Sequence, residues 1–176
     1  MKAAITSIEA LKRLSSFPLE AMLQEIGPLA LVQRATEFQA SGATLYKQFT
    51  RTVEAEGRPP VARHALSLLL GLDHGLVVAL GRENPEGELL LGRGVEADVQ
   101  LPDASVSAKH AAVRWDAWRR TAWLRDLGST NGTLVNGKQF TGEVELVESN
   151  IVTLGTDTAF LFLRTETLYA MVHTKE

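Results

Sequence analysis

The stretch DLGSTNGTLVNG, residues 126–137, gathers turn-forming residues between two apolar segments. Its two Asn-Gly pairs, Asn131-Gly132 and Asn136-Gly137, are strong turn signals, because both residue types tolerate positive φ and glycine does so without steric penalty. They predict two tight turns around a short strand at residues 133–135. An edge hairpin would explain the asparagines and glycines but would leave the preceding Ser-Thr pair without a role. The stretch therefore has to be interpreted together with the other loops of the chain.

The composition is that of an ordinary globular chain. Its 176 residues are 45% hydrophobic and 22% charged, which is enough to bury a core in one large or two small domains. The longest apolar runs, such as residues 65–72, are too short to cross a bilayer, and no basic region followed by a hydrophobic signal core stands at the N-terminus. The absence of cysteine removes disulfides and thiolate chemistry and fits a reducing compartment. We expect a cytoplasmic protein.

The formal net charge of −3 argues against broad binding to nucleic acid or to an anionic membrane. Both kinds of binding depend on accumulated Lys and Arg. An anion bound by this chain must therefore be held by a local cluster of donors.

The first 74 residues have helical periodicity. Apolar residues recur at helical spacing from residue 5 to 14 and from 19 to 26, and the segments 29–38, 44–53 and 61–72 continue in the same style. The spacing predicts a helical domain or extension of four to five short helices over residues 1–74. It contains no motif that indicates a chemistry.

From residue 75 onward, short apolar or alternating runs are separated by turn signals. The candidate strands lie at residues 76–80, 88–91, 98–101, 111–115, 121–127, 143–146, 151–154, 159–163 and 168–172. Many short strands at this spacing indicate an antiparallel sandwich or barrel and not a parallel α/β sheet. We expect an all-β domain over residues 75–176 behind the helical one, α+β overall. Arg119 and Arg120 fall at an expected hairpin tip, where they are either solvated or available to an acidic partner.

Three polar loops of the β half share one kind of chemistry. At one end of a sandwich, loops far apart in sequence converge, so these three can form a single site. Their side chains are Arg93, Ser107, Lys109, Thr130 and Asn131. A guanidinium, an ammonium, two hydroxyls and a carboxamide suit a phosphate dianion, whose oxygens accept several charge-assisted hydrogen bonds.

Four groups of residues resemble, in order and spacing, the motif series of the forkhead-associated (FHA) domain. They are Gly92-Arg93, Ser107-x-x-His110, Ser129-Thr130-Asn131-Gly132-Thr133 and Asn136-Gly137. Four linked motifs are far more specific than any one of them. The resemblance covers about residues 75–165 and implies a β-sandwich of about eleven strands whose apical loops bind a phosphothreonine peptide.

The resemblance also implies a role for each matching residue. Arg93 and Ser107 would bind the phosphate, Thr130 would contact the phosphate or the threonine pocket, and Asn131 would hydrogen-bond the peptide backbone. The paired turns would hold Thr130 and Asn131 in place, so that little entropy is lost on binding.

Three further residues, Gly92, His110 and Gly132, are expected to support the site, His110 from inside its loop and without touching ligand. Ala108 stands where many FHA domains have an Arg or Asn able to reach the phosphate. The missing contact is of a kind worth about 1.5–3 kcal/mol, so affinity would fall unless Lys109 or another base replaces it.

Catalysis is not expected, and neither is a metal or a cofactor. None of the four histidines has a metal-binding spacing such as His-Glu-x-x-His, and the chain has no nucleophile elbow and no Walker loop. The sequence instead predicts a signalling adaptor that recognises a phosphothreonine-containing protein, either a Ser/Thr kinase or its substrate. The helical part would pack on the sandwich, mediate self-association or bind a partner. The alternative is a scaffold protein that uses the same fold for assembly without phosphate.

Overall fold

The computed structural model describes residues 5–7, 10, 11, 13, 16, 18–33, 76–81 and 85–173. Its elements are β1 (Ile5–Ser7), α2 (Leu19–Ile26), β2 (Leu29–Gln33), β3 (Leu76–Leu80), β4 (Glu86–Gly92), β5 (Val99–Gln100), β6 (Ala111–Asp116), β7 (Thr121–Asp126), β8 (Thr133–Val135), β9 (Lys138–Gln139), β10 (Glu143–Leu146), β11 (Ile151–Leu154), β12 (Thr158–Arg164) and α5 (Thr165–Val172).

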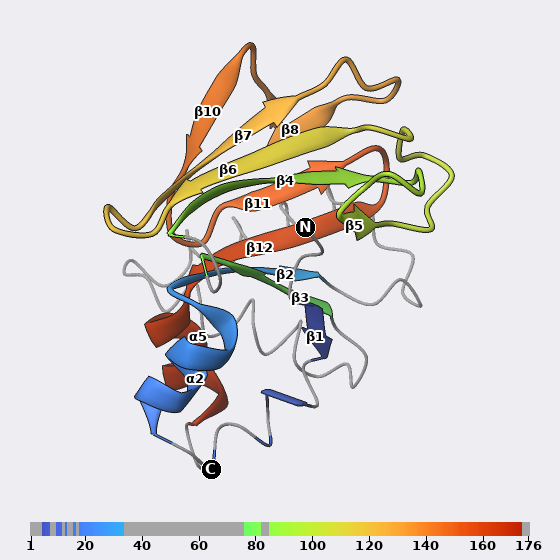
Figure 1. Cartoon of the computed structure of the whole chain (residues 1–176). Coiled ribbons are helices and arrows are strands. Elements are labelled where there is room, and N and C mark those ends of the chain that lie inside the picture. Colours follow the sequence, from blue (N-terminus) through green and yellow to red (C-terminus); the bar gives the residue numbers. More distant parts are fainter. Residues whose placement is uncertain are drawn as a thin grey trace, which may run out of the picture.

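The strands form two sheets that pack face to face (Figure 1). One has seven strands in the order β1-β3-β2-β12-β11-β8-β9, and the other has five in the order β10-β7-β6-β4-β5. Among the strands that the structure describes, every pairing is antiparallel except that of β4 with β5. The expected β-sandwich is therefore confirmed.

The main core lies between the two sheets. The alternation of β6 sends Val113 and Trp115 inward and leaves Arg114 on the solvent side. They pack against side chains of the seven-stranded sheet such as Phe160 and Phe162. Gly87 makes room for the indole, because a Cβ at that position would lie 2.5 Å from the Trp115 ring.

A second core covers the outer face of the seven-stranded sheet, where α2 and α5 lie (Figure 1). Met22 and Ile26 of α2 and Leu168 of α5 pack there against β-strand side chains that include Leu161 and Leu163. Because both faces of this sheet are buried, β12 is a continuous apolar run from Ala159 to Leu163 without alternation.

The helical prediction for the first part of the chain is correct at α2 and at residues 10, 11 and 13, and wrong at two other places. Residues 19–26 are helical and end at Gly27, whose φ is +81°. Leu29–Gln33, expected within a helix, is instead strand β2, hydrogen-bonded between β3 and β12. Ile5–Ser7 is likewise a strand, which pairs with β3. A short run of consecutive apolar residues is compatible with a buried helix and with a strand buried on both faces, and here the pairing partners decide.

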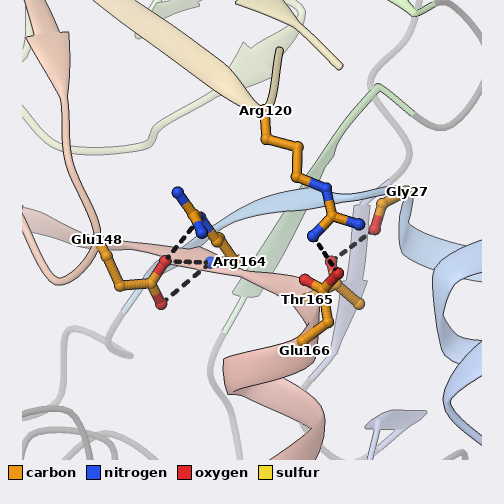
Figure 2. Close-up of polar contacts among 6 residues, drawn as sticks. All are labelled: Gly27, Arg120, Glu148, Arg164, Thr165 and Glu166. Atoms are coloured by element: carbon orange, nitrogen blue, oxygen red, sulfur yellow. Dashed lines mark hydrogen bonds and ion pairs between the residues drawn. The ribbon is translucent and has the colours of Figure 1, made fainter. Parts of the chain in front are cut away.

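The last predicted strand, residues 168–172, is also wrong, because this run lies in helix α5. Figure 2 shows the polar contacts that hold the start of α5 against the end of α2. The hydroxyl of Thr165 donates to the carbonyl of Gly27, and the Thr165 N–H donates to Pro28 O at 3.0 Å. Burial of Leu168 against α2 and β12 then favours a helix over the strand that this five-residue run suggested.

The remaining strand predictions are confirmed, although residues 98–101 pair only at Val99–Gln100. The structure adds β9, which the sequence did not indicate. The hairpin tip with Arg119 and Arg120 is also present; the two side chains pair with Asp116 and Glu166, the second contact drawn in Figure 2.

Part of the predicted helical domain lies outside the described residues. This holds for the segments 44–53 and 61–72 and for the end of the segment 29–38. The division into domains at residue 74 therefore stays a prediction. In the ranges that the structure describes, no helix is long and apolar enough to cross a membrane.

Candidate functional site

Three loops gather at the end of the sandwich where β4 ends and β6 begins. We name them the arginine loop (residues 93–98), the serine loop (101–110) and the threonine loop (127–132). The N–H of His110 donates to Leu91 O at 3.0 Å, and the N–H of Leu127 donates to His110 O at 2.9 Å, so the bases of the loops are joined by backbone bonds. The turn between β6 and β7 lies at the opposite end (Figure 1).

The arginine loop lies directly against the serine loop. Arg93 N–H donates to Ser107 O at 2.9 Å, Gly94 N–H donates to Ala108 O at 3.0 Å, and the Arg93 Nε–H donates to Val106 O at 3.2 Å. Gly92 permits this approach, since a Cβ there would lie only 2.2 Å from Ala108 O. The structure thus brings the Arg93 side chain beside Ser107, with its guanidinium exposed.

The threonine loop meets the serine loop through one hydroxyl. Ser107 Oγ accepts a hydrogen bond from Thr130 N at 3.0 Å and lies 3.4 Å from Thr130 Oγ1. Thr130 is exposed and Ser107 is half-buried, so both hydroxyls can be reached from solvent.

His110 lies fully buried beneath these contacts and bonds to both loops. Its Nδ1 accepts from Ser107 N–H at 3.0 Å, so the ring hydrogen stands on Nε2. Nε2 donates it to Gly132 O at 3.0 Å. The neutral Nε2–H tautomer therefore ties the serine loop to the threonine loop from inside, two residues from Thr130.

Asn131 and Lys109, the other two predicted ligands, already have partners within the protein. The Asn131 Nδ2 donates to Ser105 O at 2.8 Å, and the Lys109 ammonium lies 2.8 Å from a carboxylate oxygen of Glu96. The hydrogen bond and the charge of Glu96 raise the pKa of Lys109. Both ions are well exposed, with 61% and 69% of their side-chain surface accessible, so the pair can exchange with other partners.

Asp126 organises the threonine loop, and the sequence interpretation gave it no role. Its carboxylate accepts from the N–H groups of Gly128 and Ser129 and from the hydroxyls of Ser129 and Thr133. Burial alone would raise the pKa of Asp126, but the hydrogen bonds outweigh it and hold the pKa below its ordinary value. An Asp two residues before Gly-Ser is a recognisable Asx-turn signal, so the sequence contained the clue.

Asp103 does the same for the serine loop. It accepts from Ser105 N at 2.8 Å and from the hydroxyl of Thr158 on β12. Burial opposes ionisation here too, yet the bonds from Thr158 and Ser105 leave the pKa of Asp103 lowered. Asp126 thus holds the threonine loop and Asp103 the serine loop, each by accepting hydrogen bonds from hydroxyl and backbone donors.

The arrangement of the three loops favours an anion. No carboxylate pairs with Arg93 in the described part of the chain. Among the same residues, no group of three His, Asp or Glu side chains could hold a metal ion.

In a comparison with protein families, residues 89–155 match the model of the FHA domain. The FHA domain-containing protein FhaA of Mycobacterium tuberculosis is 43% identical over 70 residues, which are 40% of this chain and 13% of that protein. Protein phosphatase 2C 70 of Arabidopsis thaliana is 35% identical over 99 residues, 51% of this chain and 16% of that protein. The match thus spans less than a fifth of either relative. A solved structure from an analysis of phosphothreonine-dependent FHA domain interactions is 38% identical, covers 44% of this chain and 77% of its own, and has a TM-score of 0.41.

Proposed function

From the premise that residues 89–155 form an FHA domain, we propose that this chain binds a phosphothreonine-containing segment of a partner protein. The observation that carries the proposal is the junction of the arginine, serine and threonine loops. An exposed guanidinium without a carboxylate partner in the described residues lies there beside two accessible hydroxyls. A phosphate dianion would accept hydrogen bonds from all three groups.

The hydrogen bonds that Arg93 and Ser107 make within the protein are compatible with phosphate binding. Arg93 uses its backbone N–H and Nε within the protein, and its two terminal amino groups have no partner among the described residues, so they are available to phosphate oxygens. Ser107 Oγ accepts from Thr130 N and donates its own proton to Thr130 Oγ1. Its contact with Thr130 Oγ1, at 3.4 Å, is long for a hydroxyl bond and is easily exchanged for a phosphate oxygen.

The remaining roles follow the family pattern. Thr130 would contact the phosphate or the threonine side chain, and Asn131 would bond to the peptide backbone beside it. Lys109 would contribute only by leaving Glu96, because the two are paired in the unliganded site. Gly92, His110 and Gly132 would hold the loops that carry these groups.

The chain would then act as an adaptor in the cytoplasm and not as an enzyme. Its partner would be a Ser/Thr kinase or a kinase substrate, and residues 1–74 would supply a second contact. The cytoplasmic location in this proposal comes from the cysteine-free sequence.

A degenerate phosphothreonine peptide library, followed by calorimetry with one selected peptide in phosphothreonine, phosphoserine and unmodified forms, tests the proposal. We expect the phosphothreonine form alone to bind well, and Arg93→Ala to abolish binding. Arg119→Ala, at the opposite end of the sandwich, is the matched control and should leave affinity unchanged. Binding that persists in Arg93→Ala would overturn the phosphate-binding role.

Equal binding of all three peptides would instead favour phosphate-independent assembly. Two observations make this second function worth testing. Ala108 offers no contact to phosphate beyond its backbone, and the positive charge of the nearby Lys109 is already paired with Glu96.

A further inference from the structure

Given the proposed function, on which this step rests, we infer that Ser105 and Gly155 are positioning residues that fix the orientation of the Asn131 side chain. Neither residue belongs to the motif series in the sequence. Both act through contacts between the threonine loop, the serine loop and the β11–β12 turn (residues 155–157).

The contact with Ser105 decides which way the Asn131 amide points. Since its Nδ2 donates to Ser105 O at 2.8 Å, the amide nitrogen must face the serine loop. One N–H and the carbonyl oxygen of the amide then remain. A peptide backbone presents one donor and one acceptor per residue, so an amide held in this orientation is ready to pair with it.

The Ser105 carbonyl can serve as a fixed point because Ser105 is held on two other sides. Its N–H donates to Asp103 Oδ1 at 2.8 Å, and its Oγ accepts from Thr156 N at 3.0 Å. The other oxygen of Asp103 is bonded to the hydroxyl of Thr158. The β11–β12 hairpin thus determines where the acceptor of Asn131 lies.

Gly155 makes this packing sterically feasible. A Cβ there would lie 2.4 Å from Ser105 Oγ and 2.6 Å from Ser105 O, the very acceptor of the Asn131 amide. Its φ of +66° is also unfavourable for a side chain. Gly155 N–H donates to Gly132 O at 3.1 Å, the carbonyl that also accepts from His110. The backbone following Asn131 and its side chain are therefore held by the same turn.

The side-chain amide signals of Asn131 in a ¹⁵N–¹H spectrum of the full chain test this inference. Asp103→Ala removes the acceptor of Ser105 N–H, so we expect the two Asn131 NH₂ signals to shift and their hydrogen exchange to accelerate. Asp103→Asn keeps an acceptor for Ser105 and should restore the wild-type signals. Gly155→Ala should shift them as well, where it folds. Unchanged Asn131 signals in Asp103→Ala would overturn the inference.

A double-mutant cycle gives the functional readout. We expect Asp103→Ala to weaken binding of the selected phosphothreonine peptide by about three- to tenfold, the effect of one misplaced hydrogen bond. The same change should cost nothing further in an Asn131→Ala background, because the group it positions is gone. An equal loss in both backgrounds would show a general structural effect and contradict the inference.

The two proposals fail in different ways. If no peptide binds the wild type while the Asn131 signals respond as expected, phosphopeptide recognition fails and the orientation of the amide stands. If Arg93→Ala abolishes binding but the Asn131 signals ignore Asp103, recognition stands and the positioning role fails.

Discussion

At the scale of single residues, Asp126 has the densest set of hydrogen bonds at the site, with four donors on one carboxylate. Asp126→Ala would leave two backbone N–H groups of the threonine loop and the hydroxyls of Ser129 and Thr133 without their acceptor. We expect a loss of about 1–3 kcal/mol in the free energy of unfolding, measured by urea denaturation at neutral pH. The control Asp157→Ala, an exposed carboxylate whose hydrogen bond within the described residues comes from Thr156, should change it by less than about 0.5 kcal/mol.

The lowered pKa of Asp126 also predicts a pH dependence. A carboxylate whose pKa is lower in the folded than in the unfolded state contributes stability above its unfolded pKa and loses it as the pH falls through the folded value. Wild-type stability should therefore fall below about pH 4 more steeply than that of Asp126→Asn. Parallel urea-unfolding curves for the two proteins between pH 7 and pH 3 would contradict this.

The ion pair of Lys109 with Glu96 predicts that removing the charge of Glu96 strengthens peptide binding. Glu96→Gln removes a negative charge beside the serine loop and frees the ammonium, so affinity for a phosphothreonine peptide should rise. Calorimetry should show this gain shrinking at high salt and disappearing when Lys109→Ala is added. The control Glu86→Gln, at the far end of β4, should have no effect; a similar gain there would mean that overall charge is responsible.

At the scale of secondary-structure elements, the attachment of α5 depends on a buried hydroxyl. Thr165 is fully buried, and its Oγ donates to the carbonyl that ends α2 (Figure 2). Thr165→Val keeps the shape but leaves Gly27 O without this donor. We expect a loss of about 1–3 kcal/mol by urea unfolding. Thr167→Val, two positions further along the same helix and only half-buried, should cost less than about 0.5 kcal/mol. Equal losses in the two variants would indicate that valine lowers the helix propensity and that the buried hydroxyl is not the cause.

Which elements could be predicted from the sequence depends on how their faces are buried. Strand β10 alternates polar with apolar residues, so the period of two predicts it directly. Leu29–Gln33 and Thr165–Val172 are short apolar segments whose conformation is set by distant partners, β3 and β12 for the first and α2 for the second. No local pattern distinguishes a strand from a helix in such segments.

The same limit applies to the candidate site. The motif side chains Arg93, Ser107 and Thr130 could be named from the sequence because their residue types indicate the chemistry. Ser105 and Gly155 could not, because Ser105 acts on Asn131 through a backbone carbonyl and Gly155 through the absence of a side chain. Both effects arise only when distant segments are packed together, since Ser105 and Asn131 are 26 residues apart and Ser105 and Gly155 are 50 residues apart along the chain.

At the scale of the whole molecule, strand β2 connects the first part of the chain with the sandwich. It lies between β3 and β12 and pairs with each of them over five residues. Its side chains also enter both cores, Leu31 toward the five-stranded sheet and Val32 toward the helices. Strand β2 is therefore a central strand of the larger sheet, although it precedes the FHA match by more than fifty residues.

This placement predicts that a chain of residues 75–176, the β domain expected from the sequence, does not fold as the full chain does. Without β2, strands β3 and β12 would each expose an unpaired edge, and four side chains buried at 0% accessibility would be missing from the two cores. We expect poor dispersion in its ¹⁵N–¹H spectrum or a cooperative unfolding midpoint well below that of the full chain. Adding residues 18–33 as a separate peptide should restore dispersion, whereas a peptide with Leu31→Asp should not. A truncated chain that unfolds at the same midpoint as the full one would show that β2 is dispensable and that residues 75–176 form a domain on their own.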